Sequence, residues 1–352
     1  MPILTNCNDV NGSQDKYSAN NAPIMSTSIW IVIVNYRTPA LVVNCLRSLA
    51  IQRPEVENLR VVVVDNDSRD GSVEHLASVV SFEHWDEWAT IVPNERNGGF
   101  AYGNNVGIRM ALDAPIRVDF VMLLNPDTVA RPGSVCALID IMQLNCSIGI
   151  AGSRIENGDG GAECSAHNAP SPLGELIAAS NLGLLARLLR KFVVTPPMRA
   201  DSHECDWVSG ASLMVRREVF ETIGLMDEGF FLYFEEVDFC SRARQGGWRV
   251  WFVHDSRIIH LEGAATGIKE TTRRRPGYWY DSRRRYFVKH FGVMGLVLAD
   301  MLWSAGRLSL AMRSLFGLGK GGRLHGPKRF AFDLLWGDLR FLLGVSGGTR
   351  RS

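Results

Sequence analysis

The 352-residue sequence lacks a cysteine pattern and has no marked excess of charge of either sign. Its seven cysteines are scattered without any Cys-x-x-Cys spacing, so the sequence predicts neither a disulfide framework nor a zinc site. The formal net charge of +1 gives no general reason to expect a nucleic-acid partner. With 46% hydrophobic residues the chain can bury a sizeable core. Because the cysteines show no disulfide pattern, we expect a reducing, cytoplasmic compartment.

Targeting signals and long apolar runs are also lacking. Residues 1–26 are rich in Asn, Ser and Asp and have neither the basic nor the apolar region of a signal peptide, which predicts a disordered leader. The apolar stretch 291–302 is interrupted by Asp300 and is shorter than the roughly 18–20 residues that a spanning helix needs. We therefore expect no transmembrane span.

Three short apolar runs, each followed by a polar residue, indicate buried strands. They are 29–34 followed by Asn35, 60–64 followed by Asp65, and 120–124 followed by Asn125. Amphipathic stretches between them complete a βαβ pattern. Runs without polar alternation predict a mostly parallel sheet covered on both faces, and such sheets bind ligands at the carboxyl ends of their strands. We expect an α/β fold in which these polar residues converge on one crevice.

The second half of the chain predicts a smaller ordered block and a basic end. Residues 207–216 and 248–253 have strand character, and 235–245 form a predicted helix that ends at two glycines. From residue 269 onward, Arg clusters stand beside amphipathic stretches, which indicates interfacial helices that contact anionic lipid headgroups. A solvated or ion-paired helix face explains the same clusters, so both interpretations stay open.

Two segments have residues suited to a nucleotide. After the second strand, Asp65 and Asp67 can hold a base and ribose, although an ordinary turn with Asp70 as helix N-cap explains the same residues. The glycines of 94–107 permit close approach of the backbone to a diphosphate, but their spacing is not that of a Rossmann or P-loop motif.

Carboxylates follow the third strand and open the predicted helix. Asp127 can suffice for Mg²⁺ or Mn²⁺, because one or two carboxylates plus substrate phosphates often hold such ions; a Pro-containing turn is the alternative. Glu235, Glu236 and Asp238 crowd against aromatic residues, where one carboxylate can act as a general base. Favourable charge at a helix N-terminus explains them equally plainly. His260, at an apparent strand end, is by itself more often structural than a ligand.

In their order and combination, these segments resemble the family 2 glycosyltransferases with a GT-A fold, particularly the bacterial rhamnosyltransferase-like branch. The matching segments, within residues 28–265, are 33–36, 64–68, 97–100, 103–105, 124–127, 207–211, 224–228, 230–242 and His260. The resemblance implies a Rossmann-like, mostly parallel central sheet flanked by helices, followed by an amphipathic helical extension.

The resemblance also implies a role for each matching position. Those that would bind the nucleotide sugar are Asn35, Asp65, Asp67, Asn97, Gly98, Asn105, Asn125 and Asp127. Those that would bind the acceptor are Trp207, Gly210, Tyr233 and Asp238, although core packing also explains the aromatic pair. Asp127 and His260 would hold Mg²⁺ or Mn²⁺. Glu236 stands where the family usually has an Asp as general base, and Glu235 is the second candidate.

The implied reaction is an inverting, metal-assisted sugar transfer in cell-surface polysaccharide synthesis. The expected donor is deoxythymidine-diphosphate (dTDP)-rhamnose, and the expected acceptor is a saccharide, free or carried on a polyprenyl diphosphate. The predicted domains are the leader 1–26, a GT-A domain 27–268 with a nucleotide-sugar half (27–150) and an acceptor half (151–268), and a basic helical region 269–352. A peripheral protein at the cytoplasmic face of the membrane is expected, and the sequence is compatible with an oligomer.

Two other classes share parts of this pattern. A nicotinamide-dependent oxidoreductase would have a Gly-x-Gly-x-x-Gly motif after the first strand, where residues 35–39 stand instead. A non-catalytic sugar-nucleotide or carbohydrate-binding protein on the same fold stays open, although the joint presence of Asp127, Glu235, Glu236 and His260 favours an enzyme.

Overall fold

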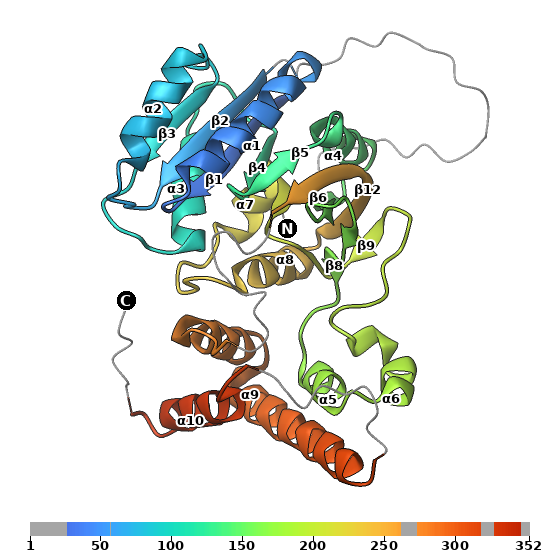
Figure 1. Cartoon of the computed structure of the whole chain (residues 1–352). Helices are drawn as coiled ribbons and strands as arrows, with labels where there is room; N and C mark the ends of the chain where they lie inside the picture. The colour runs from blue at the N-terminus through green and yellow to red at the C-terminus, as the bar shows by residue number, and fades with distance from the viewer. Residues whose placement is uncertain (1–26, 57, 262–272, 318–326, 346–352) are drawn as a thin grey trace, which may run out of the picture.

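The computed structural model describes residues 27–56, 58–261, 273–317 and 327–345 (Figure 1). Its strands are β1 (Ser28–Asn35), β2 (Asn58–Asp65), β3 (Ala89–Pro93), β4 (Phe120–Leu124), β5 (Thr128–Ala130), β6 (Ile148–Glu156), β7 (Ala162–Glu163), β8 (Ala166–His167), β9 (His203–Cys205), β10 (Trp207–Val208), β11 (Ser212–Arg216) and β12 (Arg249–His260). Its α-helices are α1 (Pro39–Gln52), α2 (Ser72–Phe82), α3 (Phe100–Leu112), α4 (Ser134–Leu144), α5 (Pro172–Ser180), α6 (Gly183–Leu188), α7 (Arg217–Ile223), α8 (Glu235–Gln245), α9 (Gly277–Leu315) and α10 (Phe330–Leu342), with short 3-10 helices at Arg53–Glu55 and Arg190–Phe192. The predicted leader and the domain boundary predicted at 268–269 lie outside the described residues.

Ten strands form one sheet, eight of them in the order β3-β2-β1-β4-β11-β6-β12-β5, while β7 pairs with β6 and β9 pairs with β12. β1 pairs in parallel with β2 and β4, and β2 with β3, so the three predicted strands form the predicted βαβ arrangement. β11 is antiparallel to β4 and β6, whereas β6 and β12 are parallel to each other. The predicted α/β fold with a central sheet flanked by helices is confirmed, but the sheet is mixed: β1, β2, β3 and β4 run parallel, whereas β11, β5, β7 and β9 pair antiparallel with their neighbours.

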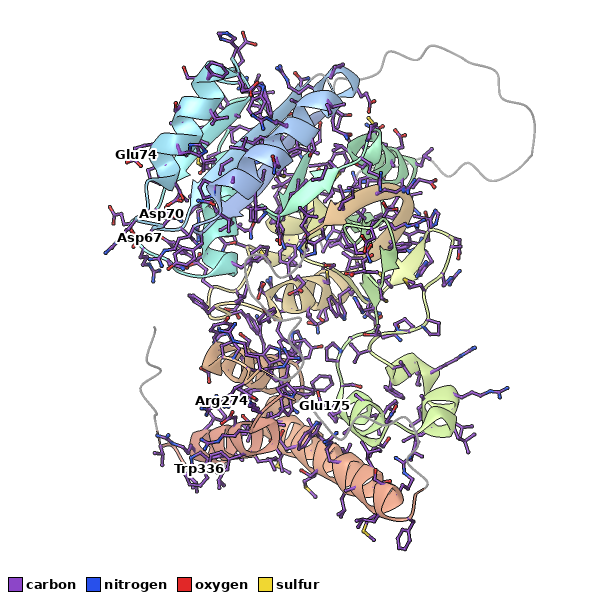
Figure 2. All side chains as sticks on the ribbon, in the orientation of Figure 1. Asp67, Asp70, Glu74, Glu175, Arg274 and Trp336 are labelled. Carbon is purple, nitrogen blue, oxygen red and sulfur yellow. The ribbon has the colours of Figure 1, made fainter. Side chains whose placement is uncertain are left out.

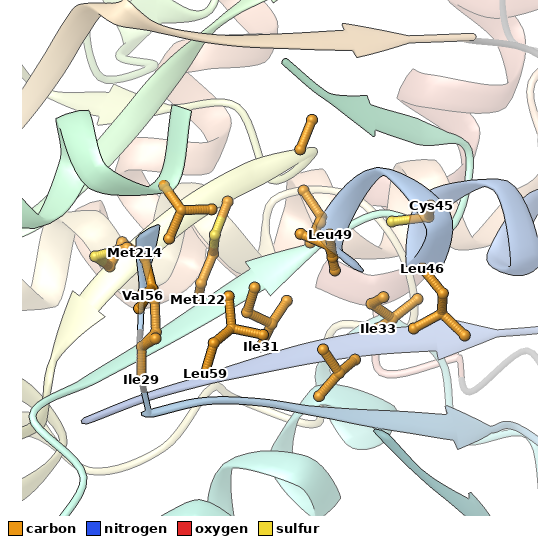
Figure 3. Close-up of a cluster of buried hydrophobic side chains, with 14 of the residues drawn as sticks. Ile29, Ile31, Ile33, Cys45, Leu46, Leu49, Val56, Leu59, Met122 and Met214 are labelled. Atoms are coloured by element: carbon orange, nitrogen blue, oxygen red, sulfur yellow. The ribbon is translucent and has the colours of Figure 1, made fainter. Parts of the chain in front are cut away.

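The central strands are buried on both faces, in two separate cores. Ile29, Ile31 and Ile33 of β1 face the helices α1 and α2, in the cluster drawn in Figure 3. Val32 of β1 and Val64 of β2 point to the opposite face, which α3 and α8 cover. Because successive side chains of a strand point to opposite faces, a strand buried on both sides appears in the sequence as an unbroken apolar run. Polar residues are therefore left for the carboxyl ends of these strands.

Two local predictions need correction. The N-cap of α2 is Gly71, with a φ of 84°, rather than Asp70; the carboxylate of Asp70 accepts hydrogen bonds from the amide and hydroxyl of Ser72 instead. The predicted strand 207–216 is divided into β10 and β11, and the turn between them brings Gly210 against Glu236. The predicted helix 235–245 is confirmed as α8, which positions the acidic residues at its first turn.

The C-terminal helices lie below α8 in Figure 1, beside α5 and α6. Helix α9 is broken at Gly292, whose φ of 70° and ψ of 177° are not helical, into the halves 277–291 and 293–315. By length and composition α9 is apolar enough to cross a membrane, whereas the apolar stretch 291–302 alone predicts no transmembrane span. The reason is that the stretch 291–302 is only part of a helix that continues to Leu315.

Candidate active site

The carboxyl ends of β1 and β2 meet in a buried polar cluster. Asn35 and Asp65 are partners in the strand register, and the Asn35 amide donates to Asp65 Oδ2 at 2.6 Å. Both side chains are almost fully buried. Ser68, which the sequence did not single out, donates its backbone amide and its hydroxyl to the two oxygens of Asp65, at 2.9 and 2.7 Å. The ends of β1 and β2 therefore meet as predicted, and the hydrogen bonds fix the orientation of the Asp65 carboxylate.

Asp67 lies at the exposed margin of this cluster. It adopts a left-handed backbone conformation with a φ of 60°, and its carboxylate accepts a hydrogen bond from Arg69 Nε at 2.7 Å. Figure 2 shows Asp67 beside Asp70 at one edge of the molecule. Its side chain is therefore accessible from solvent, unlike that of Asp65.

The glycine-containing segment 94–107 packs against the backbone that leads to α8. Asn97 Oδ1 accepts a hydrogen bond from the amide of Gly99 at 3.0 Å. A Cβ at Gly98 would lie 2.4 Å from the ring of Tyr102, and a Cβ at Gly99, where φ is 88°, would lie 2.0 Å from the carbonyl oxygen of Phe231. These glycines therefore make room for protein atoms, including the backbone that leads to the acidic helix, whereas the sequence indicated room for a diphosphate.

Asn105 does not belong to the nucleotide side of the site, contrary to prediction. Its amide group donates to the carbonyl of Met226 and to Glu228 Oε1, both at 2.9 Å, and its Oδ1 accepts from the amide of Met226 at 3.1 Å. The residue is 1% exposed. Because every polar atom of this side chain already has a protein partner, Asn105 holds the 226–228 loop against α3.

Asn125, Asp127 and His260 come together at the ends of β4 and β12. His260 Nε2 lies 3.1 Å from Asp127 Oδ1 and 3.4 Å from the side-chain nitrogen of Asn125. Asn125 Oδ1 is buried without a hydrogen-bond partner. A carboxylate, an imidazole and an unsatisfied amide oxygen are suitable ligands for Mg²⁺ or Mn²⁺, with phosphate oxygens and water completing the shell. Among the described residues no three His, Cys, Asp or Glu side chains form such a group, so the protein alone offers an incomplete set.

The neighbouring glutamates Glu235 and Glu236 differ in their surroundings. Burial, and then the adjacent charge of Glu236, raises the pKa of Glu235 well above its usual value, and its Oε2 has no hydrogen-bond partner. Burial raises the pKa of Glu236 to about 7, while the backbone amides of Val237 and Gly210 favour its ionised form. Each carboxylate leaves its Oε2 without a hydrogen-bond partner, but more backbone amides favour the ionised form of Glu236 than that of Glu235, and Gly210 lies in van der Waals contact with Glu236.

Asp238 is enclosed by cations rather than open to an acceptor, contrary to prediction. The side chain is fully buried, and it accepts hydrogen bonds from Arg242 Nε and Lys289 Nζ, while His290 Nε2 lies 2.9 Å away. Burial alone would raise the pKa of Asp238, but these hydrogen bonds outweigh it and hold the pKa below its ordinary value. Asp238 therefore joins α8 to α9.

The other residues predicted to bind the acceptor are partly engaged by the protein. Trp207 donates its indole N–H to the carbonyl of Asn168 at 3.0 Å and stacks on His167 with ring centroids 4.2 Å apart. Tyr233 stacks on Tyr278 at 6.2 Å. A cavity of about 400 Å³ opens on the His167 side of Trp207, between residues 162–168 and 196–205, and none of the predicted catalytic residues lines it.

Comparison with known proteins agrees with this geometry. Residues 30–224, more than half of the chain, match the family described as glycosyl transferase family 2, and the chain belongs to this family. It is 31% identical over 231 residues to an N-acetylglucosaminyl-diphospho-decaprenol L-rhamnosyltransferase of Mycobacterium tuberculosis, covering 62% of this chain and 71% of that one. It is 27% identical over 239 residues to the dTDP-rhamnosyl transferase RfbF of Shigella flexneri, covering 68% and 71%.

Two solved structures show the same fold. The mannosyltransferase PcManGT of Pyrobaculum calidifontis, in complex with GDP-Man and Mn²⁺, has a TM-score of 0.52 and 15% identity, over 91% of this chain and 82% of that one. GalNAc-T7 with UDP, GalNAc and Mn²⁺ has a TM-score of 0.50 and 18% identity, over 68% of this chain but only 45% of that one. The likeness confirms the predicted GT-A architecture.

Proposed function

We propose that this family member is an inverting glycosyltransferase in which Glu236 is the general base. The observation that carries the proposal is the placement of Glu236, a carboxylate with a pKa raised to about 7, at the N-terminus of α8 and facing backbone amides. A base with a pKa near the working pH removes a proton efficiently while staying largely ionised. Glu235, whose pKa is raised well above its usual value by burial and by the charge of Glu236, is then the neutral member of the pair.

The residues of the chain divide the reaction between two sides of the crevice. Asn35, Asp65 and Asp67 would hold the nucleoside of the donor, and Glu236 would take the proton of the acceptor hydroxyl as its oxygen attacks the anomeric carbon. The bond from that carbon to the diphosphate breaks as the new glycosidic bond forms, so the anomeric configuration inverts. Asp127, His260 and the free oxygen of Asn125 would hold Mg²⁺ or Mn²⁺, which when bound stabilises the charge of the departing nucleoside diphosphate.

The relatives support a proposal for the substrates. The Mycobacterium tuberculosis relative is named for L-rhamnosyl transfer to a diphospho-decaprenol-linked sugar, and the Shigella flexneri relative for dTDP-rhamnosyl transfer. We propose dTDP-rhamnose as the donor and a saccharide, free or on a polyprenyl diphosphate, as the acceptor, in cell-surface polysaccharide synthesis. A thermal-shift screen with dTDP-, UDP- and GDP-sugars and Mn²⁺ or Mg²⁺ tests the donor, since the preferred one raises the Tm by mass action. A larger shift with UDP- or GDP-sugars would contradict it.

We also propose that the protein is peripheral at the cytoplasmic face of a membrane, through the second half of α9 and through α10. Their apolar outer face consists of exposed side chains, among them Met294, Leu298, Met301, Leu308 and Met312 of α9 and Phe332, Trp336 and Leu339 of α10. Figure 2 labels Trp336 on the lower side of α10. The inner face is polar or closely packed: Asp300 pairs with Arg283 at 2.9 Å, and a Cβ at Gly306 would lie 2.8 Å from Ala179 of α5. A helix with such a second face fits the plane of an interface better than a span.

Substitution on the outer face tests this membrane proposal. Met301 and Leu308 are 64% and 65% exposed, so M301D with L308D adds two charges without removing a buried contact. We expect this variant to lose most of its sedimentation with phosphatidylglycerol vesicles, whereas Leu144→Asp, at an 83% exposed position of α4, should not. Equal binding by both variants would contradict the proposal.

A non-catalytic sugar-nucleotide-binding protein is the competing function. It would bind donor as the enzyme does, but without any requirement for a base at Glu236. Turnover across a panel of acceptors, and its loss in Glu236→Gln, therefore separates the two functions.

A further inference from the structure

The acidic pair follows a turn in an unfavourable backbone conformation. We call residues 227–238 the acidic segment. Within it, Tyr233 and Phe234, with φ of 72° and 68°, are consecutive non-glycine residues in the left-handed region, and Phe234 is the N-cap of α8. L residues rarely adopt this conformation, so it persists only where the surroundings determine it. The first half of α9 provides those surroundings: Phe234 packs on Trp279 and Tyr286, with ring centroids 6.0 and 5.6 Å apart.

One ammonium group joins the two ends of the acidic segment. Nζ of Lys289 lies 2.8 Å from Asp227 Oδ2 and 2.9 Å from Asp238 Oδ2. Asp227 precedes the left-handed turn, and Asp238 follows Glu236 by two residues in the first turn of α8. The ion pairs of Lys289 therefore close a loop that contains both the turn and the acidic pair.

The neighbouring cations do not duplicate this bridge. Arg242 pairs with Asp238 from within α8, and its other two nitrogens donate to the carbonyls of Ile223 and Leu225, so it joins α8 to the end of α7 without contacting Asp227. Arg285 pairs with Asp227, and His290 contacts Asp238. Lys289 contacts both carboxylates and lies just before the break of α9 at Gly292, where a cation also stabilises the end of the helix.

We propose that Lys289 is a positioning residue for the general base. By bridging Asp227 and Asp238, it fixes the N-terminus of α8, and with it Glu236, relative to the donor side of the crevice. The inference rests on the proposed role of Glu236. Loss of the bridge displaces the base but leaves Asn35 and Asp65, on other elements, in place, so it lowers kcat and leaves the KM for the donor unchanged.

Three variants of the full-length chain test this inference. Lys289→Met removes the charge but keeps the length of the side chain, and Lys289→Arg keeps the charge. The matched control is Arg274→Met, which breaks an ion pair between the start of the C-terminal helical region and Asp333 of α10, away from the acidic segment. Two measurements apply: hydrogen–deuterium exchange of peptides from residues 227–240, and transfer kinetics with dTDP-rhamnose and an N-acetylglucosaminyl-diphospho-lipid.

We expect Lys289→Met to speed exchange in the acidic segment and to lower kcat by roughly tenfold to a hundredfold, the effect of misplacing a catalytic group by about 1 Å, with the donor KM within twofold. Lys289→Arg should restore both, and Arg274→Met should change neither. Unchanged exchange in Lys289→Met, or equal losses in Arg274→Met, would overturn the inference. The exchange measurement decides the positioning role even if wild-type protein shows no transfer, in which case it is the proposed function that fails.

Discussion

At the scale of the residue, Glu235 and Glu236 are neighbours in sequence with different environments. Glu235 is 4% exposed and its pKa is raised by burial and by the charge of Glu236, whereas Glu236 faces the backbone amides of Val237 and Gly210. Two carboxylates this close do not both ionise easily in a low-dielectric site, so their protons belong to the pair. The structure thus favours Glu235 as the member of the pair that keeps its proton to higher pH.

Glu236 should make stability fall as pH rises. Its pKa is raised on folding from 4.5 to about 7, so the folded state binds the extra proton, and the free energy of unfolding decreases between about pH 5 and pH 7. Glu236→Gln removes a charge that partial burial disfavours, and it should raise the free energy of unfolding at pH 8 by roughly 1–2 kcal/mol, less than the full shift implies because the side chain is not fully enclosed. Urea denaturation at pH 5 and pH 8 checks this; a gain that is as large at pH 5 would contradict it.

The site residues that the sequence placed correctly are those whose positions follow from the pairing of adjacent strands. Asn35 and Asp65 meet because the carboxyl ends of adjacent parallel strands must meet. Asn105 and Asp238 were misassigned because their partners lie 121–123 and 51–52 residues away, Met226 and Glu228 for the first and Lys289 and His290 for the second. Nothing in the local pattern distinguishes a carboxylate aimed at substrate from one enclosed by distant cations.

At the scale of the element, helix α3 begins at a backbone contact with the acidic segment. The amide of Phe100 donates to the carbonyl of Phe231 at 2.8 Å, directly after Gly99. Gly99 has a φ of 88° and a ψ of −175°, a region essentially restricted to glycine, with no room for a Cβ beside Phe231. This contact sets the spacing between the start of α3 and the acidic segment.

Gly99→Ala, compared with a control at Gly71, should separate the cost of backbone strain from the cost of steric crowding by the new methyl group. We expect it to lower the free energy of unfolding by roughly 2–4 kcal/mol and to reduce transfer, since the acidic segment must move to admit the methyl group. The control is Gly71→Ala, where φ is 84° but no atom lies within 4 Å of the new Cβ, so only about 1 kcal/mol of backbone strain is expected. Equal effects of the two substitutions on stability and on transfer would contradict this account of Gly99.

At the scale of the whole molecule, a buried arginine joins the C-terminal helices to α5. Arg283 of α9 is 1% exposed and pairs with Glu175 of α5, Asp300 in the second half of α9, and Asp338 of α10, at 3.2, 2.9 and 3.3 Å. Burial, and then the charge of Asp300, raises the pKa of Asp338 to about 6. The cluster brings together elements more than 160 residues apart in sequence.

Removal of this arginine should loosen the C-terminal helices. Arg283→Met leaves three acidic groups without their buried cation, so we expect a loss of about 3–5 kcal/mol in the free energy of unfolding. Because the raised pKa of Asp338 favours its neutral form at low pH, the loss should be smaller at pH 5 than at pH 8. Arg117→Met, which breaks an exposed pair with Glu218, should cost less than about 1 kcal/mol. Chemical denaturation at both pH values checks this, and equal losses would contradict it.

The architecture was largely predictable from the sequence, but the arrangement of its last part was not. Strands buried on both faces are recognisable in the sequence as apolar runs such as 29–34. Helix α8 is recognisable by the acidic residues at its start and the glycines at its end. The reversed direction of β11 and the break of α9 at Gly292 depend on tertiary packing and leave no local signal. The sequence indicated the charge and amphipathic character of the C-terminal region, but not its role in holding the acidic segment.

The central claim is that Glu236 removes the proton of the acceptor in a metal-assisted sugar transfer. The most direct measurement is transfer from dTDP-rhamnose to an N-acetylglucosaminyl-diphospho-lipid by the wild type, Glu236→Gln and Glu235→Gln, each with Mn²⁺ and with EDTA. We predict that Glu236→Gln lowers kcat by roughly 10²–10⁴-fold without loss of donor binding, that Glu235→Gln is less impaired, and that EDTA abolishes wild-type turnover. Wild-type turnover that is unaffected by both EDTA and Glu236→Gln would contradict the account.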